Sequence, residues 1–162
     1  MSEKKVLVAY FSAEMGRTKK KAEEIAQIAG ADLYEIKPAV PYTQEDVYWP
    51  NSKCRSVVEM HTKGFRPEMV TSDLPDVQAY DVIFIGFPIW CAVAPQIINT
   101  FLEALDFSNK TIVPFATSGG SGYGPTDQSI HPSCPDSVTW KKGAVLNRVS
   151  GEKLRDWVLG SL

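Results

Sequence analysis

Short apolar runs recur along the chain and predict β-strands. The runs at 5–11, 81–87 and 111–116 are almost wholly apolar, as expected of strands that are buried on both faces of a sheet. Residues 32–37 alternate between polar and apolar positions, which is typical of a strand nearer a sheet edge. A last, short strand is predicted at 143–147.

Segments with helical periodicity separate these strands. From 18 to 29 and from 95 to 105, apolar residues recur at helical spacing, so each segment would bury one face. Gly30 is expected to end the first of these helices. Ser150 is expected to cap a final helix at the end of the chain.

The hydrophobic pattern between 42 and 75 is too irregular to define strands or long helices. Pro50 prevents one continuous helix there. We expect a shorter helix that starts at Asn51 or Ser52 and ends at Gly64.

Five strands that alternate with helices are typical of a doubly wound α/β fold, a parallel sheet covered on both faces. We expect residues 1–162 to form one such domain, because a chain of 162 residues buries enough surface to fold without disulfides or a metal. Ligands of this fold bind at the carboxyl edge of the sheet. The loops after 5–11, 81–87 and 111–116 should therefore meet in one crevice.

Charge and cysteine content narrow the classes of partner. A formal net charge of −2 argues against nucleic-acid binding through bulk positive charge. Cys54, Cys91 and Cys134 are odd in number and form no Cys-x-x-Cys pair, so we expect a reducing, cytoplasmic setting and no metal site. Neither a secretory signal nor a membrane span is expected, since glycine and proline interrupt the longest apolar stretch, 82–95.

The first loop, 12–18, joins a strand to a helix N-terminus, where unpaired N–H groups and the helix dipole favour an anion. Its candidate phosphate-binding residues are Ser12, Gly16, Arg17 and Thr18, which offer hydroxyl donors, a tight turn and a positive charge. The alternative is that Ser12 and Thr18 only cap the helix and that Arg17 is solvated.

The second loop, 86–95, is almost wholly apolar, whereas connecting loops are normally polar. An exposed Pro88, Ile89 and Trp90 would wall one side of a flat apolar ligand, while backbone amides bind its polar edges. Alternatively, neighbouring segments bury this loop. Cys91 is a further candidate contact, and we expect its thiol to be free and buried rather than redox-active.

The third loop follows the strand at 111–116 and is rich in glycine and hydroxyl residues, so its backbone can lie close to a ligand. The candidate contacts are Thr117, Ser118, Gly119, Gly120, Ser121 and Gly122. A Gly-Ser stretch of this kind is alternatively only flexible. The chain has no Walker loop, and the third loop matches neither G-x-G-x-x-G nor G-x-S-x-G.

Taken together, the three loops resemble those of the flavodoxin-like proteins, and the resemblance covers nearly the whole chain. Tyr10-Phe11-Ser12 with Gly16-Arg17-Thr18 looks like the family's phosphate loop. Residues 86–90 resemble the loop beside the isoalloxazine ring, and 117–122 the loop on its far side. The resemblance implies the strand order 2-1-3-4-5 and bound flavin mononucleotide (FMN).

The resemblance also implies electron transfer. We expect an FMN-dependent oxidoreductase that passes electrons from NADH or NADPH to a small acceptor such as a quinone, with no catalytic side chain of its own. The alternative is a one-electron carrier that shuttles between redox proteins. A net charge of −2 favours the enzyme, because carrier flavodoxins use strongly acidic fields to find their partners.

A third function class, the receiver domain of two-component signalling, shares this fold. It needs an acidic cluster and an Asp at the end of a central strand, but this chain has Ser12 and Gly86-Phe87 at those positions, which argues against a receiver.

An apolar ring loop is also a surface that a second subunit covers, so a homodimer stays open.

The ring loop differs from that of carrier flavodoxins because 87–95 contain no glycine. In the carriers, a glycine in this loop flips its peptide so that a carbonyl accepts a hydrogen bond from one-electron-reduced flavin. A non-glycine residue at positive φ costs about 1–2 kcal/mol. We therefore expect weak stabilisation of that reduced form.

Overall fold

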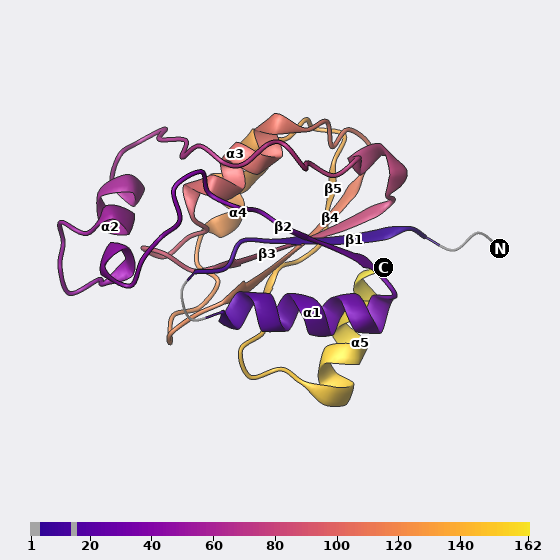
Figure 1. Cartoon of the computed structure of the whole chain (residues 1–162). Coiled ribbons are helices and arrows are strands. Elements are labelled where there is room, and N and C mark those ends of the chain that lie inside the picture. Colours follow the sequence, from indigo (N-terminus) through magenta and orange to yellow (C-terminus); the bar gives the residue numbers. More distant parts are fainter. Residues whose placement is uncertain (1–3, 14–15) are drawn as a thin grey trace.

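The structure, a computed structural model, describes residues 4–13 and 16–162. At its centre, β1 (Val6–Tyr10), β3 (Val82–Pro88) and β4 (Thr111–Thr117) form the middle of a parallel sheet (Figure 1). All of β1 is buried, and β3 and β4 are each buried except for one end residue. Their apolar composition follows from this position, because helices cover both faces.

The strands lie in the order β2 (Asp32–Glu35), β1, β3, β4 and β5 (Thr139–Trp140), as the resemblance to the flavodoxin-like proteins implies. β2 (Asp32–Glu35) pairs with β1 at one edge, and its mostly exposed side chains account for its polar alternation. Because all pairs are parallel, the carboxyl ends of the central strands meet at one edge of the sheet. The three candidate loops begin there.

The far edge of the sheet differs from the prediction of one strand at 143–147. Two short strands, β5 (Thr139–Trp140) and β6 (Ala144–Val145), both pair with β4. Thr111 is paired with Thr139 and Phe115 with Ala144, so the outer segment has one more residue than β4 between these pairs. This extra residue interrupts the ladder and divides the last strand in two.

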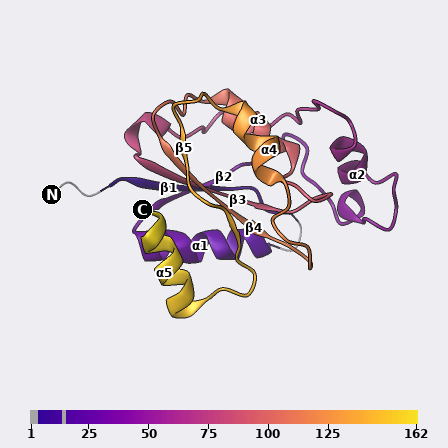
Figure 2. The same ribbon diagram turned by 180° about the vertical axis from the view of Figure 1, so that it is seen from behind.

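Two helices cover each face of the sheet (Figures 1 and 2). α1 (Arg17–Ala29) and α5 (Gly151–Ser161) lie against one face, and α3 (Gln96–Ala104) and α4 (Thr126–Ile130) against the other. Successive residues of β1 therefore enter opposite parts of the core, since strand side chains alternate between faces.

Helix ends follow the prediction closely for the long helices and less closely for the short ones. Gly30 ends α1 in a left-handed conformation, φ 62, and its N–H bonds to the carbonyl of Ala26. Ser150 precedes α5, but its side chain makes no capping hydrogen bond. α4 has only 5 residues and was not predicted, because so short a helix has no periodic pattern.

The segment between β2 and β3 extends beyond the carboxyl edge of the sheet, at the left of Figure 1. It contains a 3₁₀ helix, Glu45–Val47, and α2 (Arg55–Met60), which is shorter than the predicted helix. Turns precede α2, since the Cys54 N–H bonds to the carbonyl of Asn51. Other single turns are at Val77–Ala79 and His131–Ser133.

Within the described ranges, no helix is long and apolar enough to cross a membrane.

Candidate functional site

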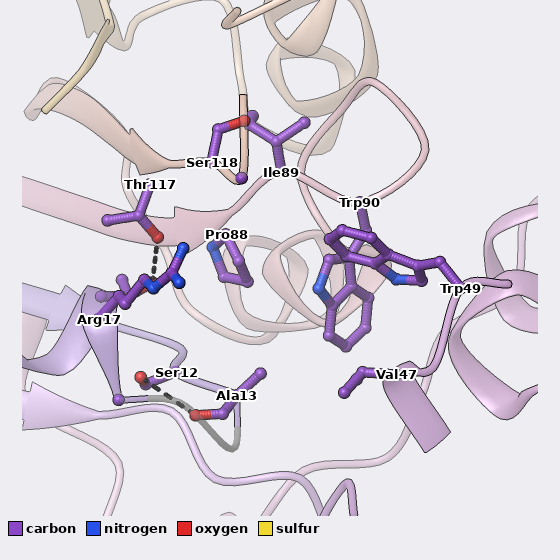
Figure 3. A pocket seen from close by; sticks show the side chains of 13 residues that line it. Ser12, Ala13, Arg17, Val47, Trp49, Pro88, Ile89, Trp90, Thr117 and Ser118 are labelled. Atoms are coloured by element: carbon purple, nitrogen blue, oxygen red, sulfur yellow. Dashed lines mark hydrogen bonds between the residues drawn. The ribbon is translucent and has the colours of Figure 1, made fainter. Parts of the chain in front are cut away.

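A cavity opens at the carboxyl edge of the sheet, where the loops after β1, β3 and β4 meet (Figure 3). Its volume is about 270 Å³, near the lower end of the range for small-molecule sites. The lining residues are Ser12, Ala13, Gly16, Arg17, Thr18, Val47, Trp49, Pro88, Ile89, Trp90, Thr117, Ser118 and Gly119. The structure thus brings residues from all three candidate loops together.

Four predicted candidates do not line this cavity. Gly120 and Ser121 line a neighbouring groove, and Gly122 is exposed outside both. Cys91 is exposed at the tip of a turn, whereas the sequence led us to expect a buried thiol. Residues 14–15 of the first loop lie outside the described residues.

The N-terminus of α1 forms one end of the cavity. Gly16 adopts φ 68, and this left-handed conformation turns the chain into the helix. The first bond of the helix runs from the Lys20 N–H to the carbonyl of Gly16 at 3.1 Å. The N–H groups of Arg17 and Thr18 precede that bond and have no partner among residues 4–13 and 16–162, so they suit an anion.

The two hydroxyl groups at this end of the cavity have different partners. Ser12 Oγ accepts a hydrogen bond from the Lys19 N–H at 3.2 Å, which is the capping role that the sequence left open. Thr18 and Thr117 share a hydrogen bond, with their Oγ1 atoms 2.8 Å apart. Two hydroxyls with one bond between them retain one hydrogen for a further acceptor.

The aromatic side of the cavity differs from the exposed Pro88-Ile89-Trp90 wall that the sequence predicted. Ile89 is 4% exposed and Trp90 2% exposed, so for these two the expectation was wrong. The reason is that Trp90 packs edge-on against Phe11 and Tyr42, at centroid distances of 5.4 and 5.0 Å. Only a small part of each side chain therefore faces the cavity.

Trp49 supplies the exposed aromatic surface that the sequence assigned to Trp90. It follows the 3₁₀ helix Glu45–Val47, is 48% exposed and lines the cavity together with Val47 (Figure 3). Sequence reasoning missed this residue, because the poor pattern between 42 and 75 gave no reason to place the segment at the sheet edge. The available signal was the aromatic pair Tyr48-Trp49 in an otherwise polar stretch.

Arg55 links the segment that carries Val47 and Trp49 to the aromatic wall, the packed rings of Phe11, Tyr42 and Trp90. Its guanidinium lies 3.8 Å from the centroid of the Tyr42 ring, and its Nε donates to Glu59 Oε2 at 2.9 Å. The Tyr42 hydroxyl also donates to Glu59, and burial together with this bond raises the pKa of Tyr42. Since Tyr42 packs on Trp90, the network joins that wall to the segment that carries Trp49.

The tip of the second loop is a strained turn. Trp90 and Val93 exchange backbone hydrogen bonds of 2.8 and 3.2 Å, and between them Cys91 and Ala92 have φ 49 and 77. Each positive φ at a non-glycine residue costs about 1–2 kcal/mol. The lack of glycine therefore does not keep this loop out of positive φ, and the expected weak stabilisation of one-electron-reduced flavin stays a prediction. Gly124 packs against the turn so closely that a Cβ there would lie 2.3 Å from the Ala92 carbonyl oxygen.

Comparison with known proteins places the chain among flavoproteins. The sequence profile of the flavodoxin family matches residues 5–160. The chain is similar to the crystal structure of a candidate flavoprotein from Bacteroides eggerthii, with 44% identity, 97% of each chain covered and a TM-score of 0.88. A candidate flavoprotein from Bacteroides uniformis is 41% identical, with 98% of this chain and 99% of that chain covered and a TM-score of 0.89.

A more distant structure is that of a flavoprotein from Lactobacillus acidophilus in complex with FMN. It is 27% identical, with 88% of this chain and 93% of that chain covered and a TM-score of 0.68. No curated protein sequence matches the chain.

Proposed function

Because the chain belongs to the flavodoxin family, we propose that it binds FMN in the cavity at the carboxyl edge and acts as an oxidoreductase. The electrons would pass from a nicotinamide cofactor to a small acceptor such as a quinone. FMN, when bound, supplies the redox chemistry, and the protein supplies binding and orientation.

The observation that carries this proposal is the combination of an anion site and an aromatic site in one cavity. The N–H groups of Arg17 and Thr18, which have no partner among the described residues, and the Arg17 guanidinium suit a phosphate. The exposed indole ring of Trp49 suits a flat ring system. FMN carries both groups in one molecule.

The third loop supports the same assignment because it is held in place. The Ser118 N–H donates to Asn147 Oδ1 at 2.7 Å, and the Asn147 amide donates back to the Ser118 carbonyl. The Gly120 N–H donates to Ser118 Oγ at 3.2 Å. These bonds favour a shaped ligand contact over the alternative of a flexible Gly-Ser linker, and Gly119 lines the cavity without a side chain to block a ring edge.

Two features favour an enzyme over a one-electron carrier. The cavity opens to solvent beside Trp49, which gives a small molecule access to a bound flavin. The formal charge of −2 provides little long-range attraction toward a basic protein partner.

Titration with FMN, followed by the quenching of flavin fluorescence, tests the binding site. Trp49→Ala should weaken FMN binding about tenfold, because the ring loses an aromatic contact. Tyr48→Ala is the matched control, since Tyr48 is 59% exposed and does not line the cavity. A wild-type protein that leaves FMN fluorescence unquenched, and that is colourless after free FMN has been removed, would contradict the proposal.

Steady-state oxidation of NADH or NADPH in the presence of a quinone then separates the two activities. Turnover with the small acceptor supports the oxidoreductase. Rapid exchange with a flavodoxin reductase without such turnover would support the carrier instead.

A further inference from the structure

A positively charged groove lies beside the candidate flavin cavity. It consists of two adjoining hollows, of about 480 and 420 Å³, that share Arg17, Asn147 and Arg148. Lys20 and Lys21 line the first hollow, and the third loop lines the second. We refer to the two hollows together as the basic groove.

Most of the basic side chains in the basic groove form no ion pair with a described carboxylate. The Lys21 ammonium donates to a backbone carbonyl at 2.7 Å and lies 3.5 Å from the carboxylate of Glu24. Arg17, Lys20 and Arg148 are exposed and form no ion pair with any carboxylate in the described part of the chain. The proposed function assigns Arg17 to the flavin phosphate. In a protein with a net charge of −2, Lys20 and Arg148 then remain as a local site of positive potential in the groove.

The basic groove is continuous with the flavin cavity. Arg17 and Thr117 line both the cavity and the first hollow, and Ser118 and Gly119 line both the cavity and the second. A donor whose nicotinamide meets a flavin in the cavity could therefore place its phosphate groups in the groove. Lys20 and Arg148 line the groove alone, so they are separable from the flavin site.

We propose that the basic groove binds the phosphate groups of the electron donor, and that the donor is NADPH rather than NADH. This inference rests on the proposed function, because the cavity needs a donor only if it holds a flavin. Guanidinium groups bind phosphate through paired, charge-assisted hydrogen bonds. NADPH differs from NADH by its 2′-phosphate, which arginine accommodates in dinucleotide-binding proteins.

Calorimetric titration with 2′,5′-ADP, which carries the 2′-phosphate without the nicotinamide, tests the groove in both the apo-protein and the FMN-loaded protein. Arg148→Ala should weaken 2′,5′-ADP binding about tenfold or more and raise the KM for NADPH by a similar factor. It should leave the Kd for FMN unchanged. Arg155→Ala, the same loss of charge at an exposed position of α5 outside the groove, should change neither.

Each other outcome has a distinct meaning. Failure of the wild-type protein to bind 2′,5′-ADP, or equal binding by the two variants, overturns the inference. If Arg148→Ala weakens FMN as much as 2′,5′-ADP, the groove serves the flavin phosphate, so the inference fails while the proposed function stands. If the wild-type protein binds 2′,5′-ADP but not FMN, the proposed function fails and the assignment of the donor fails with it.

Discussion

The hydrogen-bonded pair of Thr18 and Thr117 links the first loop to the third, and valine substitutions probe it without changing side-chain shape. The two residues are 2% and 4% exposed, and their Oγ1 atoms are 2.8 Å apart. Thr18→Val leaves the Thr117 hydroxyl without this partner, and an unpaired buried polar group costs about 1–3 kcal/mol. The free energy of unfolding of the apo-protein should fall by that amount. When both residues are valine, no hydroxyl is left unpaired, and stability should return close to wild type.

The double variant isolates the contribution of the pair to flavin binding. The pair retains one hydroxyl hydrogen, which we expect to be donated to the FMN phosphate. A hydrogen bond to a charged group contributes about 1.5–3 kcal/mol, which corresponds to roughly ten- to a hundredfold in Kd. T18V/T117V should therefore bind FMN more weakly by this factor. Riboflavin has no phosphate and should bind the variant and the wild type equally.

Urea unfolding of the apo-proteins measures the first effect, and fluorescence titrations with FMN and riboflavin measure the second. If T18V/T117V binds FMN and riboflavin more weakly by the same factor, the pair acts on the ring rather than on the phosphate. If its affinity for both is unchanged, the phosphate lies away from the pair. Each of these results refutes the reasoning, even if the variant is fully stable.

Two further substitutions test the backbone around the cavity. Ala92→Gly should raise the free energy of unfolding by up to about 1 kcal/mol, since relief of the strain at φ 77 outweighs the entropic cost of glycine; Ala39→Gly, at an exposed position without positive φ, should lower it by about 0.5–1 kcal/mol. Thermal unfolding compares the two variants. A greater loss of stability for Ala92→Gly than for Ala39→Gly would show that the turn is not strained. Gly86→Ala should destabilise the protein by about 1–3 kcal/mol or more, because its Cβ would lie 2.1 Å from the Phe115 ring. The control Gly160→Ala, with no atom within 4 Å of its Cβ, should be neutral or stabilising by the same measurement, and equal effects of the two would contradict the packing at 86.

The central strands were predictable because burial on both faces leaves a strong local signal, whereas their order was implied by the resemblance to the flavodoxin-like proteins. The runs that became β1, β3 and β4 are nearly all apolar, and their fully buried positions require this. The divided outer strand was not predictable, because the extra residue opposite β4 changes the pairing without changing the composition.

The candidate site was predictable where it depends on loops at strand ends, and less so where it depends on tertiary contacts. Ser12, Thr18 and Thr117 followed from their positions after strands. Trp49 did not, because its place at the cavity depends on a segment that Arg55 holds through the ring of Tyr42 and the Glu59 carboxylate. For the same reason, the sequence left open whether neighbouring segments bury the apolar second loop, and the rings that pack on Trp90 come from Phe11 and Tyr42.

A crystal structure of the protein loaded with FMN tests the flavin site most directly. The phosphate should lie within hydrogen-bonding distance of the N–H groups of Arg17 and Thr18, and the ring should lie against Trp49. FMN bound elsewhere on the protein, or with its phosphate away from the N-terminus of α1, would contradict the proposed site.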